Sequence, residues 1–278
     1  MSKSFAVIGD PIDHSLSPNI HSAAFREMDL DSSYIAYRIP KGELEEGIEG
    51  LKKIKIDGFN ITIPHKIEMM KYLDKIDESC SLIGAVNTVS NKDGVLKGYN
   101  TDMDGFLEPF KKKRLSINGT KVLLIGAGGA ARAIVAGFAK EKAKSITIAN
   151  RALEKGENLS KFAKKTGLDS NAIKIEDVKD SAKDYDIIVN ATSVGMFPEN
   201  YDAITSLENS FKKGQIVFDV VYNPVKTQLL KLAEKEGAIT VDGLSMLVYQ
   251  AAKSFELWTG EEMPVEQVRT ALKHFLEN

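Results

Sequence analysis

The chain has 278 residues, a formal net charge of −2, 43% hydrophobic residues and 27% charged residues. This balance is that of an ordinary globular protein of one large or two smaller domains, and its short basic run at residues 111–114 is too narrow for the basic face of a nucleic-acid binder. Its single cysteine, Cys80, excludes an intramolecular disulfide and favours a reducing compartment.

Neither a membrane span nor a signal peptide is expected, because no apolar run approaches about 18 residues. The four histidines have no metal-ligand spacing with each other or with Cys80. We therefore expect a cytoplasmic protein without a metal site, without a membrane or nucleic-acid partner, and present as a monomer or homodimer.

Short apolar strands alternate with amphipathic helical stretches along the chain. Runs rich in β-branched and aromatic residues predict strands, and apolar residues three or four apart predict helices. The elements expected first are a strand at 5–9, a helix at 18–28, a strand at 33–39, a helix at 43–54, a strand at 58–63 and a helix up to about residue 73. Asp93-Gly94, between two extended runs in 87–100, then predicts a hairpin.

The second half repeats the alternation. A helix that begins near Thr101 is expected to break near Pro109. Strands are expected at 121–126, 145–150, 186–192, 215–222 and 238–243, with helices between most of them, and final helices at 244–258 and 264–276. The alternation predicts parallel sheets with helices on both faces.

A glycine-rich turn links the strand at 121–126 to the next helix. The residues Gly126-Ala127-Gly128-Gly129-Ala130-Ala131 fit the pattern G-x-G-x-x-A. The first glycine permits a tight turn, the second lets the backbone approach a pyrophosphate, and the helix start favours phosphate groups. The pattern alone also occurs in glycine-rich connectors of unrelated α/β proteins, but its place between strand and helix predicts a dinucleotide cofactor.

The next strand lacks the acid that NAD-binding units carry. Such units place an Asp or Glu roughly 20 residues after the turn, on the ribose 2′-hydroxyl. Here the strand ends in Asn150-Arg151. An arginine pairs with a 2′-phosphate and can stack on adenine, so the sequence predicts NADP, with Arg151 as the selector. Lys155, one helical turn on, adds charge on the same side; the alternative for both cations is a solvated surface.

The position of this turn divides the chain. Because the dinucleotide pattern begins near residue 121, the residues before it must form a separate α/β domain, and the last helices have no strand left in the second sheet. We expect two three-layer α/β domains. They are a discontinuous substrate-binding catalytic domain, 1–101 plus 245–278, and a Rossmann-type NADP-binding domain with a parallel sheet, 102–244.

Four short polar stretches lie at strand ends in the first domain. They carry Ser15 and Ser17, Thr62 and Lys66, Asn87, and Thr101 with Asp102. Ser17 could instead be a helix N-cap before Pro18, and Asp102 a first-turn acid. Since ligands bind at the carboxyl ends of strands in open α/β sheets, the group predicts a site for a small ligand with several hydroxyls.

Hydride transfer from a secondary alcohol also needs a group that takes the hydroxyl proton. Lys66 and Asp102 are the predicted pair, in which the carboxylate orients the ammonium and bonds a neighbouring hydroxyl. A lysine acts as a base only where its surroundings favour the neutral amine, and a nearby carboxylate favours the charged form. Whether Lys66 serves as the base therefore stays open. His65 is the rival base, and is expected to point elsewhere.

Eight stretches occur in a fixed order between about residues 5 and 260: SLSP, GFNITIPHK, GAVNT, GYNTD, GAGGAARA, NRALEK, DVVYNP and GLSMLVYQAAKSFELWTG. Together they resemble shikimate dehydrogenase. The resemblance implies an NADPH-dependent, reversible reduction of 3-dehydroshikimate to shikimate in aromatic amino-acid biosynthesis. It also implies a substrate cleft between the two domains.

The resemblance also implies the role of individual residues. Ser15 and Ser17 would bind the substrate carboxylate, Lys66 would transfer the proton, and the remaining substrate contacts would be Thr62, Asn87, Asp102, Tyr222 and Gln250. The cofactor would be lined by Gly126, Ala127, Gly128, Gly129, Ala130, Asn150, Arg151, Ala152, Leu153, Glu154, Lys155, Val220 and Gly243, with Glu78 near it.

One position departs from the family, whose usual Asn-Arg-Thr is here Asn150-Arg151-Ala152. The lost hydroxyl weakens the expected hold on a 2′-phosphate, although Arg151 keeps the charge. Two alternatives stay open. One is an NAD-dependent quinate/shikimate dehydrogenase, against which Asn150-Arg151 argues. The other is a non-catalytic NADP-binding regulatory protein, against which Lys66 and Asp102 argue, because binding alone needs no base.

Overall fold

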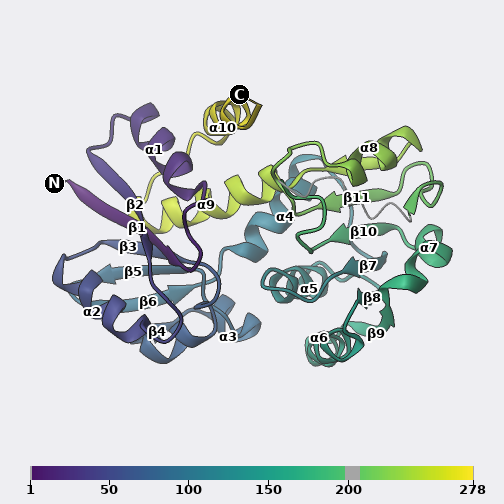
Figure 1. The fold of residues 1–278 in the computed structure, drawn as a ribbon, viewed down its shortest axis with the longest axis horizontal. Coiled ribbons are helices and arrows are strands. Elements are labelled where there is room, and N and C mark those ends of the chain that lie inside the picture. Colours follow the sequence, from purple (N-terminus) through teal and green to yellow (C-terminus); the bar gives the residue numbers. More distant parts are fainter. Residues whose placement is uncertain (1, 198–206, 278) are drawn as a thin grey trace. The chain divides into compact units, whose positions relative to one another are not determined.

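The computed structural model describes residues 2–197 and 207–277. The chain forms two compact units: unit 1 runs up to Asp104 and resumes at Val248, and unit 2 is the continuous segment Gly105–Leu247. The chain passes between the units within helices α4 (Asp102–Lys112) and α9 (Gly243–Thr259). Figure 1 shows the elements of both units.

Unit 1 is built on a six-stranded sheet of order β2-β1-β3-β5-β6-β4. Besides most of α9, its elements are β1 (Lys3–Gly9), α1 (Ser17–Glu27), β2 (Ser32–Arg38), α2 (Leu44–Lys53), β3 (Gly58–Ile61), η1 (Glu68–Tyr72), β4 (Lys75–Ile76), α3 (Glu78–Ile83), β5 (Thr88–Lys92), β6 (Val95–Tyr99) and α10 (Val265–Glu277). Strand β1 is parallel to β2 and β3, whereas β5 is antiparallel to both β3 and β6.

The parallel arrangement expected from the alternation of strands and helices is confirmed for β1, β2 and β3, but not for β5. The hairpin predicted at Asp93-Gly94 is confirmed, with φ of +54° and +85° at these residues and direct pairing of β5 with β6. A two-residue turn with two positive φ values joins antiparallel neighbours, which makes the sheet mixed. The helix expected up to residue 73 is only the five-residue 3-10 helix η1.

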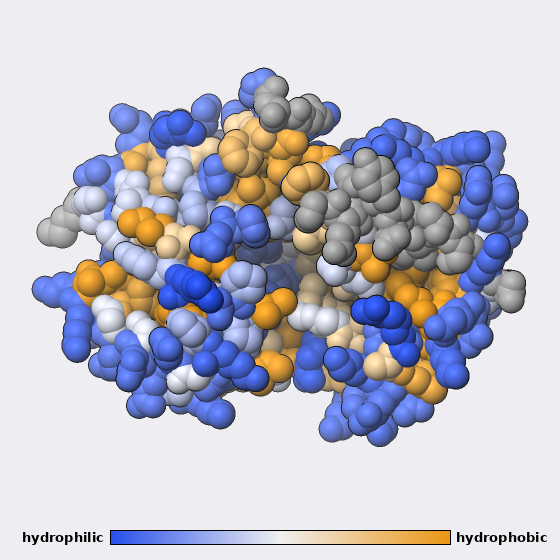
Figure 2. Space-filling model, viewed as in Figure 1, coloured by the Kyte–Doolittle hydropathy of each residue, from blue (hydrophilic) through white to orange (hydrophobic). Residues whose placement is uncertain are grey.

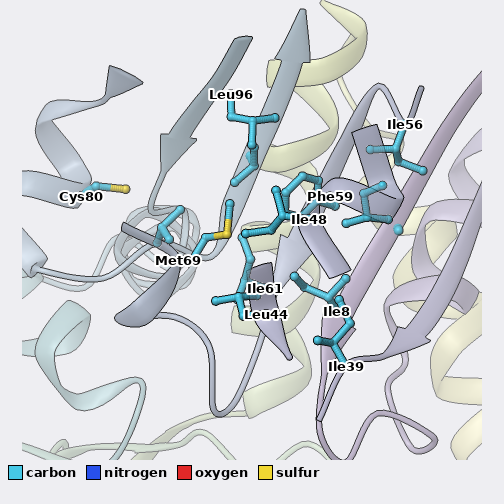
Figure 3. Packing of buried hydrophobic residues seen from close by; sticks show 14 residues of the cluster. Ile8, Ile39, Leu44, Ile48, Ile56, Phe59, Ile61, Met69, Cys80 and Leu96 are labelled. Atoms are coloured by element: carbon cyan, nitrogen blue, oxygen red, sulfur yellow. The ribbon is translucent and has the colours of Figure 1, made fainter. Parts of the chain in front are cut away.

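One face of this sheet is covered by α2, η1 and α3. Leu44 and Ile48 of α2 are buried with Ile61 of β3 and Met69 of η1, and Figure 3 shows these side chains gathered in one cluster. Burying each such side chain contributes about 1.5–3 kcal/mol. Burial also raises the pKa of the Cys80 thiol in this cluster to about 12. The thiol therefore stays protonated and acts as a packing residue.

On the opposite face, aromatic side chains fasten the C-terminal helices to the sheet. Trp258 of α9 stacks on Phe5 of β1 with ring centroids 4.9 Å apart, and its indole N–H donates to the Val89 carbonyl at 2.9 Å. A Cβ at Gly58 would collide with the indole, so a glycine is needed for this close approach. Helix α10 packs on α1, and the two helices predicted at the end of the chain are confirmed.

Unit 2 is built on a parallel sheet of order β12-β11-β10-β7-β8-β9. Besides most of α4, its elements are β7 (Lys121–Ile125), α5 (Ala131–Lys140), β8 (Ser145–Asn150), α6 (Leu153–Lys165), β9 (Asp169–Lys174), η2 (Ile175–Asp177), α7 (Val178–Ser181), η3 (Ala182–Asp184), β10 (Ile187–Asn190), β11 (Ile216–Asp219), α8 (Gln228–Lys235) and β12 (Ile239–Val241). This is the doubly wound order of a Rossmann fold, whose direction switches between β7 and β10.

Helix α4 runs through Pro109, so the predicted break is wrong. Phe106 and Phe110 on either side of it are fully buried. Phe106 packs on Phe138 and Phe218 with ring centroids 5.0 and 5.1 Å apart. A proline inside a helix costs about 3 kcal/mol, and the burial of this aromatic face outweighs that cost.

Hydrophilic residues cover much of the visible face of each unit (Figure 2). Within residues 2–197 and 207–277, no helix combines the length and the apolar character needed to cross a bilayer. The same residues contain no group of three or more His, Cys, Asp or Glu side chains placed to hold a metal ion.

His21 of α1 is a buried histidine within the aromatic face of unit 1. Its ring stacks on Tyr34 with centroids 4.3 Å apart and planes 7° from parallel. Neither ring nitrogen has a hydrogen-bond partner among the described residues. Burial lowers the pKa of His21 to about 3, so the ring is neutral in the folded protein.

We expect the free energy of unfolding to fall less with decreasing pH in His21→Phe than in the wild type. The unfolded chain protonates this histidine near pH 6.5, but the folded protein only near pH 3. The unfolded state therefore binds more protons in that window, and stability falls as the pH falls through it. Between pH 7 and pH 5 the wild type should lose about 2 kcal/mol more than the variant.

Urea unfolding at the two pH values measures this difference. His21→Leu removes the same proton together with the stacked ring, so it separates titration from packing. Equal losses in the wild type and both variants would contradict the prediction.

Candidate active site

Lys66 and Asp102 form an ion pair in unit 1. Lys66 lies in the turn after β3, where its own carbonyl accepts from the Val86 N–H at 2.9 Å. Asp102 opens α4, where the positive end of the helix favours a carboxylate. Nζ lies 2.6 Å from Oδ2, and the two side chains are 20% and 10% exposed. Such a short, largely buried pair fixes the direction of the ammonium group.

The amide of Asn87 holds the other carboxylate oxygen. Its Nδ2 donates to Oδ1 of Asp102 at 2.8 Å, while its Oδ1 accepts from the Thr101 N–H at 2.8 Å. Because a carboxylate only accepts and a backbone N–H only donates, the amide has one possible orientation. Gln250 of α9 joins the group, with Oε1 3.5 Å from Asn87 Nδ2.

Ser15 and Ser17 follow β1. Ser15 Oγ accepts from the Ser17 N–H at 3.3 Å. Ser17 is the first residue of α1, the N-cap is Leu16, and no side chain caps this helix, so the interpretation of Ser17 as an N-cap is wrong. Thr62 follows β3, the parallel neighbour of β1. The three hydroxyl residues therefore lie at the same end of the two strands, where open α/β sheets bind ligands.

His65 and Glu78 lie outside this polar group. His65 is buried, and its Nε2 lies 2.6 Å from the Ile39 carbonyl. The expectation that this ring points elsewhere is confirmed. Glu78 is exposed at the start of α3, and no hydrogen bond or ion pair within the described part of the chain links it to Lys66 or Asp102.

In unit 2, residues 126–130 form the turn between β7 and α5. Gly126 has a φ of +104°, and a Cβ there would lie 2.7 Å from Thr192 Cγ2 and 3.1 Å from the Ala191 carbonyl. Only glycine fits this position. The N-cap of α5 is Ala130, which provides no side-chain hydrogen bond. No side chain therefore caps the start of this helix, whose positive end favours an anion.

The end of β8 leads to a second helix that no side chain caps at its start. Asn150 Nδ2 donates to the Ala152 carbonyl at 2.9 Å and closes the turn into α6. Ala152 is the N-cap of α6 and cannot cap it with a side chain, which is the local consequence of the missing threonine. Arg151 is exposed and forms no ion pair with any other residue in the described ranges, and Lys155, within the first turn of α6, is exposed too.

Val220 and Gly243 touch each other within unit 2. A Cβ on Gly243 would collide with the Val220 carbonyl, so α9 can begin here only with a glycine. Tyr222, two residues after Val220, is half-buried, and burial raises the pKa of its phenol. The hydroxyl therefore keeps its proton and can donate it in a hydrogen bond.

Asp219, at the end of β11, is a buried carboxylate that sequence reasoning missed. It accepts from Asn190 Nδ2 at 2.9 Å, Thr227 Oγ1 at 2.6 Å and the Val221 N–H at 3.1 Å. Burial raises the pKa of Asp219 to about 6 against these three bonds, which lower it. The carboxylate ties together the loops after β10 and β11, and the former carries the residues that Gly126 contacts. The sequence feature that could have identified Asp219 is a single acidic residue at the end of an apolar strand.

These observations define the class of the protein. Unit 2 has the strand order and the glycine turn of a dinucleotide-binding domain. Unit 1 carries a lysine–carboxylate pair among polar side chains at the ends of its strands. The chain is thus an α/β protein with a Rossmann-type unit and a second unit that holds a largely buried lysine–carboxylate ion pair.

Comparison with known proteins gives the family. Residues 7–89 match the shikimate dehydrogenase substrate binding domain, residues 109–246 match shikimate / quinate 5-dehydrogenase, and residues 243–273 match the shikimate 5'-dehydrogenase C-terminal domain. The chain belongs to the shikimate dehydrogenase family. The protein named shikimate dehydrogenase (NADP(+)) from Nitrosopumilus maritimus strain SCM1 is 67% identical over 272 residues, which are 98% of each chain.

Solved structures agree with this assignment. Shikimate 5-dehydrogenase from Listeria monocytogenes, in complex with shikimate and NAD, superposes with a TM-score of 0.90 at 38% identity, covering 98% of this chain and 96% of that one. The enzyme from Thermus thermophilus, in complex with NADP(H) and shikimate, gives 0.87 at 32% identity, covering 98% and 99%.

Gly126→Ala should destabilise the protein by about 2 kcal/mol, because backbone strain and the contacts with Thr192 and Ala191 add. Gly128→Ala is the matched control, since a Cβ there meets nothing closer than the Ala191 oxygen at 3.8 Å. Urea unfolding of both variants measures the difference. An equal loss in the two would show that the turn tolerates a side chain at Gly126.

Proposed function

We propose that this protein reversibly reduces 3-dehydroshikimate to shikimate with NADPH, a step of the shikimate pathway towards chorismate and the aromatic amino acids. The observation that carries the proposal is the largely buried Lys66–Asp102 pair, with Asn87 on the second carboxylate oxygen. The family of the chain and the name of its 67% identical relative support it. A regulatory protein that only binds NADP would not need such a pair.

Unit 1 is the substrate-binding catalytic domain in this proposal, and unit 2 the NADP-binding domain. The sequence places the boundaries at 1–101 plus 245–278 and at 102–244. The compact units divide at Asp104 and Gly105 and again at Leu247 and Val248. The polar group of unit 1 and the glycine turn of unit 2 support this division of roles.

The residues of unit 2 fit NADP. The glycine turn and the start of α5, which no side chain caps, would hold the pyrophosphate. Arg151, exposed and without an acidic partner among the described residues, would pair with the 2′-phosphate. The other lining residues proposed are Ala127, Gly128, Gly129, Ala130, Asn150, Ala152, Leu153, Glu154, Lys155, Val220, Gly243 and, in unit 1, Glu78. When bound, the nicotinamide supplies or takes the hydride at the ring carbon.

Lys66 moves the proton. During reduction its ammonium group gives a proton to the developing alkoxide, and during oxidation the neutral amine takes the hydroxyl proton. Asp102 holds Nζ in place at 2.6 Å and bonds a neighbouring hydroxyl. The carboxylate of the substrate is bound by Ser15 and Ser17. The other substrate contacts proposed are Thr62, Asn87, Tyr222 and Gln250.

The partner of the protein is thus a small molecule. A cytoplasmic location and a monomeric or homodimeric state stay predictions. Cell fractionation tests the first, and light scattering on the purified protein tests the second.

Lys66→Ala should lower kcat for shikimate oxidation by at least about 100-fold, because the proton loses its acceptor. The Kd for NADP⁺ should stay within about twofold, since the glycine turn belongs to the other unit. NADPH absorbance and a fluorescence titration measure the two quantities. Lys71→Ala, at an exposed lysine of η1, is the control that keeps activity. Undiminished turnover by Lys66→Ala would refute the assigned proton transfer.

Arg151→Ala should raise the KM for NADP⁺ by about tenfold or more and change that for NAD⁺ by less than about twofold. Only NADP carries the 2′-phosphate that the guanidinium would bind. Lys161→Ala, at an exposed lysine further along α6, is the matched control. Equal effects on both cofactors would contradict the selector role, and a wild-type preference for NAD⁺ or quinate would favour the quinate/shikimate alternative.

A further inference from the structure

Two buried side chains are linked by hydrogen bonds to the proposed catalytic group of Lys66, Asp102 and Asn87. Tyr34 of β2 is 5% exposed, and Asn60 of β3 is 6% exposed. The Tyr34 hydroxyl lies 2.6 Å from Asn60 Oδ1. Asn60 Nδ2 lies 3.0 Å from the Asn87 carbonyl oxygen and 3.0 Å from Thr88 Oγ1. Neither Tyr34 nor Asn60 belongs to the site proposed above.

From Asn60 the hydrogen bonds continue to the ion pair. Thr88 Oγ1 donates to Asn87 Oδ1 at 2.9 Å. Asn87 Nδ2 donates to Asp102 Oδ1 at 2.8 Å, and Lys66 Nζ donates to Asp102 Oδ2 at 2.6 Å. A single chain of hydrogen bonds therefore leads from the Tyr34 hydroxyl to the Lys66 ammonium.

The donors along this chain can be assigned. The Asn87 carbonyl only accepts, so the amide nitrogen of Asn60 faces it and the amide oxygen faces Tyr34. That oxygen also only accepts, so Tyr34 is the donor. Burial raises the pKa of Tyr34 well above its usual value against a hydrogen bond with the Ser17 side chain, which lowers it. The proton therefore stays on the phenol. The Tyr34 ring is in turn held by its parallel stack on His21, with centroids 4.3 Å apart.

The Asn60 amide cannot turn over without loss. Its Nδ2 also lies 3.1 Å from Ser254 Oγ of α9. A flipped amide would set its oxygen against the Asn87 carbonyl, two acceptors facing each other. Without the Tyr34 hydroxyl, the Asn60 oxygen would be a buried acceptor that lacks a donor, a loss that the amide can relieve only by tilting away from Asn87 and Thr88.

We propose that Tyr34 is a positioning residue of the active site, which fixes the Asn60 amide and through it the orientation of Asn87 and Asp102. Tyr34 acts on Asn87 and Asp102 through Asn60 and needs no contact with the substrate, whereas its hydrogen bond with Ser17 does not lead to this pair. The inference rests on the proposed function in that it assigns catalysis to Lys66 and Asp102. Its structural part, the control of Asn87 by Tyr34, can be measured without any substrate.

The kinetic test compares Tyr34→Phe with Tyr37→Phe. Tyr37 lies on the same strand, is half-buried and belongs to no part of the proposed site. Tyr34→Phe should lower kcat/KM for shikimate by about tenfold and leave the KM for NADP⁺ within about twofold. Tyr37→Phe should keep both. Wild-type values in Tyr34→Phe would overturn the proposal.

A double-mutant cycle tests the route through Asn60. In an Asn60→Ala background, Tyr34→Phe should change kcat/KM by less than about twofold, because the amide that it positions is gone. Independent, multiplying effects of the two substitutions would show that Tyr34 influences catalysis by another path, and would overturn the proposal.

A substrate-free readout separates this proposal from the proposed function. The side-chain amide protons of Asn87, followed by ¹⁵N NMR, should exchange with water about tenfold faster in Tyr34→Phe than in the wild type or Tyr37→Phe. Faster exchange in a protein that does not oxidise shikimate would refute the function and support the positioning role. Unchanged exchange would refute the positioning role whatever the substrate.

Discussion

The burial of the Asp102 carboxylate is the constraint around which unit 1 is organised. A buried charge is costly unless a counter-charge and hydrogen bonds satisfy it. The partners of the carboxylate come from separate parts of the chain: Lys66 from the turn after β3, and Asn87 from just before β5. The backbone of Asp102 is held as well, because its N–H donates to Asn100 Oδ1 at 3.1 Å. The mixed sheet brings these segments together, and its antiparallel β5 places Asn87 between the other two.

Much of the fold follows from local patterns. The apolar periodicities place most helices and strands, and Asp93-Gly94 specifies its hairpin because both residues adopt positive φ. Local sequence rules fail where contacts between residues distant in the sequence determine the structure. Pro109 stays inside α4 because Phe106 and Phe110 are buried on either side of it. The hairpin also makes the sheet mixed, because it joins two antiparallel strands. The alternation of strands and helices alone does not predict this change of strand direction.

The candidate site divides in the same way. Lys66, Asp102 and the turn at Gly126 stand at strand and helix ends, where the sequence alone marks them. Asn60 looks like an interior strand residue, and its importance appears only when Ser254, 194 positions away, is seen against its amide. Gly243 is required for a similar reason, because the Val220 backbone, in the loop after β11, lies directly against it. No pattern within a short window carries such information.

The discontinuity of unit 1 sets an order on its assembly during synthesis. A ribosome releases the N-terminus first, but Phe5 and Asn60 meet Trp258 and Ser254 only when nearly the whole chain has emerged. Unit 2 is one continuous segment, Gly105–Leu247, and can close its sheet earlier. The domain that begins the chain is therefore the last to be completed. Until α9 arrives, the nascent protein exposes an apolar sheet face that a chaperone can cover.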